Sequence, residues 1–220
     1  MDRVSLQRVG IIGLSLALVL SGAGCWNPFD PDPGDPPPPP GEQYKLRTSP
    51  DNVLWNLNTA YEYRNAEVYL ACLADSFVFH LNPADINDPD DPLPAYWGKA
   101  EETTIHTNMF ADGSDVQSIS LTLTTISIEY LQDFNRWHYR DGVDLRVTVT
   151  GVPENTTYHA TAPSEFLFQV DPGEVGPEGE VLWEIVHWWD MSNKAAMKPV
   201  APGDGAESIT FGRLKAMYRD

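Results

Sequence analysis

The sequence predicts an α+β domain, and two observations support that fold class. Between residues 49 and 110, apolar side chains recur every three or four positions, as they do in amphipathic helices. From residue 116 to residue 189, apolar and polar side chains alternate, as they do in half-buried strands. The expected order is therefore helix, helix, strand, helix and then a long, bent antiparallel sheet.

The helical half begins at Ser49-Pro50-Asp51, with Ser49 as the expected N-cap and proline at the first helical position. Arg64-Asn65 interrupts the helical spacing and separates this helix from a second, shorter one. The elements expected after it are a strand at 76–81, an acidic, proline-rich excursion at 82–96 and a third helix at 98–110.

The strand predicted at 116–131 changes phase part-way along. Its apolar positions run through Leu121 and Leu123 and then shift to Ile126 and Ile128. A one-residue change of phase indicates a β-bulge, which bends a sheet. The strands expected after it lie at 143–149, 158–170 and 181–189, with a hairpin loop at 171–180 and a short closing segment at 208–218.

The chain is divided into three parts by composition. Residues 1–25 combine a basic start, a short apolar core and small residues before Cys25, which is typical of a secretory signal. Residues 26–43 form a proline-rich tether, extended at about 3.1 Å per residue. Residues 44–220 have a globular composition and are expected to form one domain.

The first part resembles a bacterial lipoprotein signal, which implies acylation of Cys25 and attachment to the membrane of the cell envelope. Trp26 follows the cysteine, where an aspartate would retain such a lipoprotein in the inner membrane. The resemblance therefore implies the outer membrane in a Gram-negative host. The alternative is ordinary secretory cleavage, which would leave Cys25 as a plain thiol.

Charge and cysteine content exclude several classes of function. The net charge of −18 argues against binding to nucleic acid or to anionic lipid head groups. Cys72 is the only cysteine besides Cys25, so acylation of Cys25 leaves no intramolecular disulfide, and Cys72 is expected in the core. No cofactor is expected. The acidic run 85–91 lacks the glycine and terminal glutamate of a calcium loop, so it is interpreted as a solvated loop and no metal site is predicted.

Residues 56–81 carry a helix, a break, a short helix, Leu73-Ala74-Asp75 and an aromatic strand. This order resembles the ketosteroid isomerase and polyketide cyclase branches of the nuclear-transport-factor-2-like superfamily, over about residues 49–218. The closing stretch 209–215 is similar to secreted members of the same group. The resemblance implies a cone-shaped fold, with the N-terminal helices packed in the curved sheet around an internal pocket. It also implies a homodimer through the open face of the sheet.

The resemblance also implies candidate catalytic residues. His80 stands near the general base of the isomerase-like members, which is an aspartate there. Asn56 stands where those members have a tyrosine, and no matching carboxylic acid is evident. A dehydratase of the superfamily uses two histidines and an aspartate, which would correspond to His80, His106 and Asp190. The alternative for His80 is a hydrogen-bonded residue at the end of a strand.

Aromatic residues provide a second candidate site. They could line an apolar cavity that binds a small molecule, or they could pack in the core with one tryptophan exposed at a dimer face. Trp188 and Trp189 are adjacent in a strand and are therefore expected on opposite faces. The residues predicted to bind the ligand are Trp55, Trp97, Tyr130 and Trp189.

Two hypotheses of function follow from these observations. The first is a membrane-anchored envelope lipoprotein whose cone domain binds a small molecule or a protein segment without catalysis. The alternative is an enzyme of the isomerase, dehydratase or cyclase type that uses His80 as general base. A domain that only dimerises or docks another envelope protein is the third interpretation.

Overall fold

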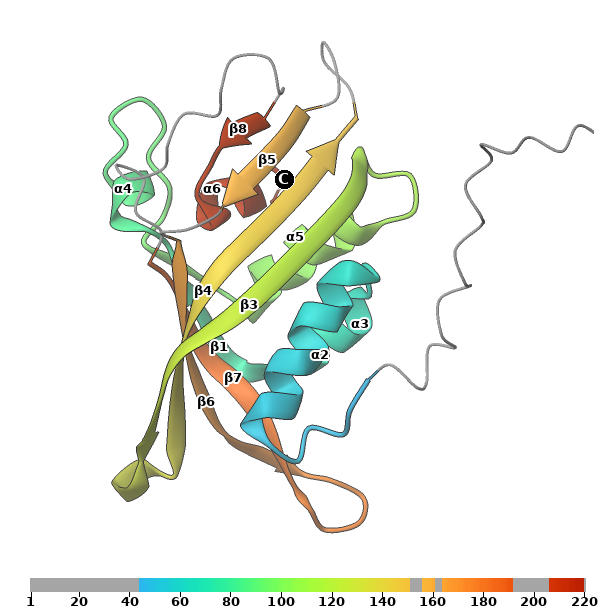
Figure 1. Ribbon diagram of the computed structural model, residues 1–220, viewed down its shortest axis with the longest axis vertical. Coiled ribbons are helices and arrows are strands. Elements are labelled where there is room, and N and C mark those ends of the chain that lie inside the picture. Colours follow the sequence, from blue (N-terminus) through green and yellow to red (C-terminus); the bar gives the residue numbers. More distant parts are fainter. Residues whose placement is uncertain (1–43, 151–155, 161–163, 192–205, 220) are drawn as a thin grey trace, which may run out of the picture. The chain divides into compact units, whose positions relative to one another are not determined.

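The computed structural model describes residues 44–150, 156–160, 164–191 and 206–219 (Figure 1). The predicted signal peptide, Cys25 and the proline-rich tether lie outside the described residues. All described residues fall in one compact unit of the chain. Within them, no helix is both long enough and apolar enough to cross a membrane.

Helix α2 (Pro50–Glu62) begins where the sequence predicts, because Ser49 caps it. The Ser49 hydroxyl accepts a hydrogen bond from the Asn52 amide at 3.2 Å. The helix ends before Arg64, whose φ of 51° lies in the left-handed region. Asn65 then caps α3 (Ala66–Ala71), and α5 (Lys99–Phe110) is the third predicted helix.

The strands form one sheet in the order β2-β1-β7-β6-β4-β5-β8, and β3 lies along the other edge of β4. Two short helices complete the described fold, α4 (Pro83–Ile86) in the acidic excursion and α6 (Phe211–Ala216) near the C-terminus. The strands are β1 (Leu73–His80), β2 (Tyr96–Gly98), β3 (Val116–Leu131), β4 (Arg136–Val149), β5 (Thr156–Ala160), β6 (Glu165–Val175), β7 (Val181–Asp190) and β8 (Ala206–Ser208).

The α+β prediction is confirmed, with two differences in the sheet. Most pairings are antiparallel, but β1 runs parallel to β7 and β8 runs parallel to β5. The strand predicted at 158–170 is two strands, β5 and β6, which pair with different halves of β4 along the same edge. Side chains of both strands keep the same alternation, so periodicity could not reveal the break.

The predicted bulge is confirmed. The pairing of β3 with β4 shifts register between Thr125 and Ser127. Thr125 pairs with Asp141 before the shift, and Ile128 pairs with Tyr139 after it. The bulge thus absorbs one residue and keeps Thr125 and Ile128 on the same side of the sheet.

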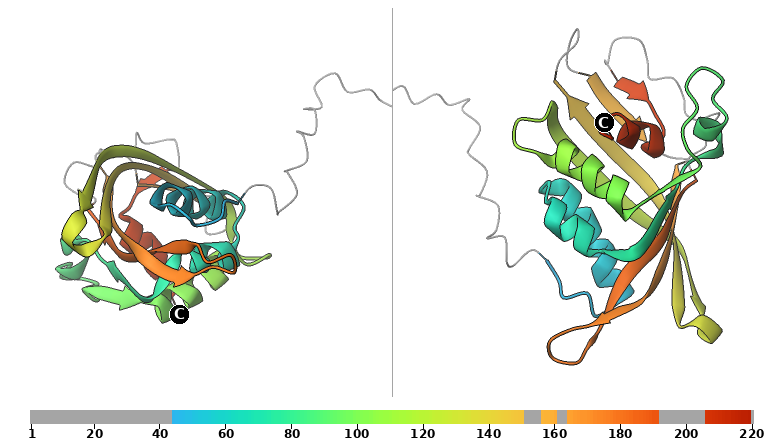
Figure 2. Two further views of the ribbon diagram at one scale, coloured as in Figure 1. Left: turned by 90° about the horizontal axis from the view of Figure 1, so that it is seen from below. Right: turned by 180° about the vertical axis from the view of Figure 1, so that it is seen from behind.

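The sheet curves around α2, with β3 and β4 on one side of the helix and β7 on the other (Figure 2). We call the surface covered by the helices the helix-facing side and the opposite surface the outer side. Trp188 is fully buried on the helix-facing side, whereas Trp189 is half-buried on the outer side, as alternation predicts. The largest core side chains on the helix-facing side of the strands are Phe77, Phe79, Phe166, Phe168 and Trp188.

The acidic excursion is the predicted solvated loop only in part: residues 89–91 are exposed, but its first aspartate is not. Asp85 is fully buried and accepts a hydrogen bond from the hydroxyl of Thr210, the N-cap of α6. Arg213 of α6 pairs with Asp88 at 3.2 Å and with Asp91 at 2.5 Å. The excursion therefore holds α6 in place. Among the described residues, no group of three or more histidine, cysteine or acidic side chains could hold a metal ion.

The cap of α2 gives a direct test of this helix start. We expect Ser49→Ala to lower the free energy of unfolding by about 1 kcal/mol, because the Asn52 amide loses its acceptor. Ser49→Asp retains an acceptor and should unfold as the wild type does. Urea denaturation followed by circular dichroism measures both variants, and equal losses in both would contradict a capping role.

Candidate functional site

His80 lies on the outer side of the sheet. Its neighbour in β1, Phe79, is buried on the helix-facing side, so the two side chains point in opposite directions. Its Nε2 atom lies 3.1 Å from Nδ1 of His187, and its ring stacks on Trp189 with centroids 4.8 Å apart. Partial burial and then His187 lower the pKa of His80, which favours a neutral imidazole. His80 therefore faces away from the space enclosed by the helices.

His106 is fully buried on α5. Its Nδ1 atom lies 3.0 Å from the backbone carbonyl oxygen of Glu102 and 3.0 Å from a carboxylate oxygen of the same residue. Its Nε2 atom lies 2.6 Å from the hydroxyl of Tyr61. Burial lowers the pKa of His106, against the opposing effect of Glu102. A neutral ring that donates from Nδ1 to Glu102 and accepts from the Tyr61 hydroxyl satisfies both contacts.

Asp190 is buried on the helix-facing side and accepts a hydrogen bond from the Gly212 amide at 2.9 Å. It therefore lies on the opposite side of the sheet from His80, and this hydrogen bond connects it to α6. The structure does not bring His80, His106 and Asp190 together.

The four aromatic residues predicted to bind a ligand are also dispersed. Trp97 is buried and donates from Nε1 to Glu102 at 2.6 Å, and Trp189 lies on the outer side. Tyr130, near the tip of the β3–β4 hairpin, packs on Trp137 with ring centroids 4.5 Å apart. Trp55 on α2 is 51% exposed and lines a pocket. These four side chains do not share one cavity.

Instead, a buried polar cluster lies where the helices meet, and sequence reasoning missed it. Glu102 is its centre: its carboxylate accepts hydrogen bonds from Tyr69 at 2.7 Å, Trp97 at 2.6 Å and Lys215 at 2.7 Å, besides the contact with His106. These bonds and charges hold the pKa of Glu102 well below its usual range despite its burial. We call Tyr61, Tyr69, Trp97, Glu102, His106 and Lys215 the Glu102 cluster.

Lys215 enters this cluster from α6 and is fully buried. Its ammonium lies 4.0 Å from the ring centre of Phe79, 4.3 Å from that of Trp188 and 4.4 Å from that of Phe211. Burial lowers the pKa of Lys215 to about 8, and Glu102 limits that fall. Every member of the cluster is at most 3% exposed, so no substrate reaches it in this structure. The cluster joins the helices to one another.

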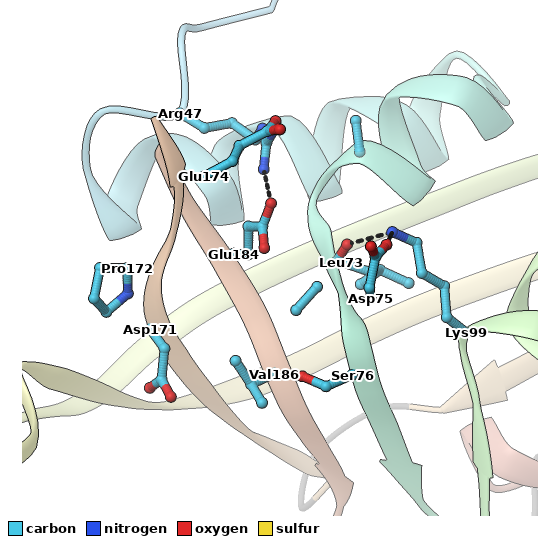
Figure 3. A pocket seen from close by; sticks show the side chains of 12 residues that line it. Arg47, Leu73, Asp75, Ser76, Lys99, Asp171, Pro172, Glu174, Glu184 and Val186 are labelled. Atoms are coloured by element: carbon cyan, nitrogen blue, oxygen red, sulfur yellow. Dashed lines mark hydrogen bonds and ion pairs between the residues drawn. The ribbon is translucent and has the colours of Figure 1, made fainter. Parts of the chain in front are cut away.

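A hollow of about 630 Å³ lies where β1 separates from β7, between the paired positions Leu73 and Val78 (Figure 3). Its charges are matched within the protein. Arg47 pairs with Glu174 and Glu184, and Lys99 pairs with Asp75. The fourth acid lining this hollow, Asp171, accepts two hydrogen bonds from Arg136, each of 2.8 Å. We call it the β1–β7 hollow; none of its four carboxylates lacks a cationic partner.

A second pocket, of about 270 Å³, lies between α2 and the bulged region of β3 and β4. At its base is Asp141, which is 1% exposed and has no hydrogen-bond partner of good geometry for either carboxylate oxygen. Its wall includes the exposed ring of Trp55. We call this the α2 pocket, lined by Asp51, Leu54, Trp55, Asn58, Thr122, Leu123, Thr125, Tyr139 and Asp141.

The electrostatics of the α2 pocket differ from those of the Glu102 cluster. Burial raises the pKa of Asp141, while the nearby hydroxyl of Thr125 opposes the rise and the carboxylate of Asp51 adds to it. Asp51 accepts a hydrogen bond of 2.9 Å from the hydroxyl of Tyr139. A buried polar group without a partner is rare in folded proteins and is a signal of function.

The sequence contains a signal for the burial of Asp141. Positions 139, 141, 143 and 145 of β4 share one side of the strand, and three of them are Tyr139, Val143 and Leu145, which are apolar or aromatic and buried. A carboxylate in that row must be buried. The strand predicted at 143–149 does not include Asp141, whereas β4 begins at Arg136.

Comparison with known proteins gives matches only at the level of structure. No protein-family model matches the chain, and no curated protein matches it significantly. A candidate scytalone dehydratase from Novosphingobium aromaticivorans is 10% identical over 65% of this chain and 80% of its own, with a TM-score of 0.47. A ketosteroid isomerase-like protein from Erwinia carotovora atroseptica is 13% identical over 65% of this chain and 94% of its own, with a TM-score of 0.42.

These are the dehydratase-like and isomerase-like kinds that the sequence resembles. A conserved protein from Planctomyces limnophilus is similar to the same extent, with 13% identity over 64% of this chain and 90% of its own and a TM-score of 0.45. The likeness concerns the fold alone, because each identity is below 25%. Residue roles must therefore come from the pocket itself.

The Glu102 cluster makes a stability prediction. We expect Lys215→Met to lower the free energy of unfolding by about 3–5 kcal/mol, because it leaves the Glu102 carboxylate buried without its cation. The double variant Glu102→Gln/Lys215→Met should recover part of that loss, since the amide carries no charge. Chemical denaturation of the three proteins tests this. A single variant as stable as the wild type would show that the ion pair does not support the fold.

Proposed function

We propose that residues 44–220 form a small-molecule-binding domain and that the α2 pocket is its site. The observation that carries this proposal is the Asp141 carboxylate, which is buried at the base of an open pocket with no hydrogen bond of good geometry to either oxygen. Leaving such a group unpaired costs stability, typically about 1–3 kcal/mol and more for a charged group. A ligand that donates hydrogen bonds to it would remove that cost.

The size and lining of the pocket indicate what fits. A volume of about 270 Å³ is slightly below the range of pockets that hold drug-sized molecules, so a ligand of one or two rings is expected. Trp55 offers a flat apolar surface at the mouth, and Leu54 and Leu123 add apolar contacts. This combination of apolar walls and a few convergent polar groups is typical of ligand sites.

We also propose that the domain works while attached to a bacterial envelope membrane. The signal-like segment 1–25, Cys25 and the proline-rich segment 26–43 support this proposal. Two or three acyl chains would anchor the chain firmly, at about 0.8 kcal/mol per buried methylene. The tether would hold the pocket away from the bilayer. A homodimer through the outer side, where Trp189 stacks on His80, stays a prediction.

A second candidate function is acid–base catalysis in the same pocket. The raised pKa of Asp141 favours it, because a carboxyl group that titrates nearer neutrality can accept or donate a proton. His80, the general base of the original hypothesis, lies on the outer side of the sheet and does not line this pocket. An enzyme would convert a bound ligand, whereas a binding domain would release it unchanged.

The proposed site can be tested with a library of one- and two-ring fragments, screened by ligand-observed NMR on residues 44–220. Among the hits, we expect Trp55→Ala to weaken binding at least tenfold, because it removes the exposed wall of the pocket. Tyr130→Ala is the matched control, since Tyr130 is also an exposed aromatic residue but does not line the pocket. A library without hits, or hits unaffected by Trp55→Ala, would contradict the proposal.

The proposed anchor requires a separate test in the full chain. In a bacterial host, the wild type should partition into the detergent phase and sediment with membranes, and Cys25→Ser should appear in the aqueous phase or keep its signal segment. Cys72→Ala is the control, because Cys72 is buried in the core and should not affect partition. Equal partition of the wild type and Cys25→Ser would rule out acylation of Cys25.

A further inference from the structure

We infer that the ligand of the α2 pocket is an organic cation, in which an ammonium group is carried by a flat apolar body. This inference rests on the proposed function, because it names the class of molecule for the same pocket.

The charges that line the α2 pocket are of one sign. Asp51 and Asp141 line it, and among the described residues no lysine or arginine does. In the β1–β7 hollow, by contrast, Arg47 and Lys99 pair with acids of the same lining. The described lining of the α2 pocket thus holds no cation that pairs with Asp141, and the Lys45 ammonium at its edge lies over the ring of Trp55 instead.

The atoms at the base of the pocket are hydrogen-bond acceptors in need of donors. Both oxygens of Asp141 and Oδ1 of Asn58 are buried without a hydrogen-bond partner of good geometry. An ammonium group has three donor hydrogens and no acceptor, so it can match several of these oxygens at once. A neutral hydroxyl would supply one donor and leave the carboxylate charge buried without compensation.

The aromatic wall also suits a cation. The ammonium of Lys45 lies 4.0 Å from the ring centre of Trp55, so a face of this ring already accepts a positive charge. Trp55 is half-exposed and can pack on the apolar body of a ligand whose ammonium reaches toward Asp141. The net charge of −18 on the chain would attract such a cation over longer distances.

The charged and titratable groups around Asp141 set the expected pH dependence. Asp51 faces it from α2, Tyr139 lies beside it on β4, and the Thr125 hydroxyl approaches it from β3. Because burial raises the pKa of Asp141, the carboxylate takes up a proton before an ordinary aspartate does as the pH falls. Affinity for a cation should therefore be highest above that pKa and decrease as the pH falls through it.

The test compares three probes of one shape and different charge: 2-phenylethylamine, 2-phenylethanol and phenylacetate. Isothermal titration calorimetry on residues 44–220 at low salt should show the amine binding at least tenfold more tightly than the alcohol, and the acid not binding. Asp141→Asn should abolish the preference for the amine. Asp75→Asn, an exposed acid of the β1–β7 hollow, should leave the preference unchanged.

Each result distinguishes this inference from the proposed function. Three results would contradict the inference that the ligand is a cation while leaving the pocket as a ligand site. They are equal affinity for the amine and the alcohol, a preference for the amine that survives Asp141→Asn, and fragment hits that are mainly neutral or acidic. A fragment library without hits would contradict the proposed function itself. Asp141→Asn removes an unpaired buried charge, so a melting temperature at or above that of the wild type verifies that the variant is folded.

Discussion

The buried ion pair between Glu102 and Lys215 is the interaction on which the rest of the structure depends. The pair joins α5 to α6, and the other donors to Glu102 come from α3 and β2 through Tyr69 and Trp97. Two charges removed from water are tolerated only when their remaining hydrogen-bonding capacity is satisfied. The Glu102 cluster meets that condition. Through Lys215 it holds α6 in the space between the other helices and the sheet.

Two buried carboxylates on the helix-facing side therefore have opposite surroundings. Four donors converge on Glu102, and its pKa is held low. No donor of good geometry reaches Asp141, and its pKa is raised. Burial alone raises the pKa of both carboxylates. The two pKa values shift in opposite directions because the fold provides hydrogen-bond donors of good geometry and a cation to one carboxylate and not to the other. The surroundings of Glu102 stabilise a core without water. Those of Asp141 leave a carboxylate without hydrogen-bond donors of good geometry at the base of an open pocket.

Local patterns in the sequence predicted the features that depend on neighbours in the chain. The cap at Ser49, the bulge next to Thr125 and the opposite orientation of Trp188 and Trp189 all follow from spacing. The Glu102 cluster could not be predicted in this way, because Lys215 follows Glu102 by 113 positions and meets it only after α6 has packed. The resemblance implied that His80 is a general base of the internal pocket. Because His80 follows the buried Phe79 in the strand, its side chain points to the outer side of the sheet instead.

The α2 pocket is also shaped by constraints that act before any ligand arrives. The bulge places Thr125 opposite Asp141, and the Tyr139 hydroxyl holds Asp51 in the first turn of α2. A carboxylate in that turn is favoured by the helix dipole, so both the dipole and the Tyr139 hydrogen bond stabilise the position of Asp51. The acceptors of the pocket are therefore fixed by the backbone and by the core, and a cation that enters would order few additional side chains. Because the cost of ordering side chains limits affinity in small sites, this rigidity would favour the selective binding proposed for a pocket of modest volume.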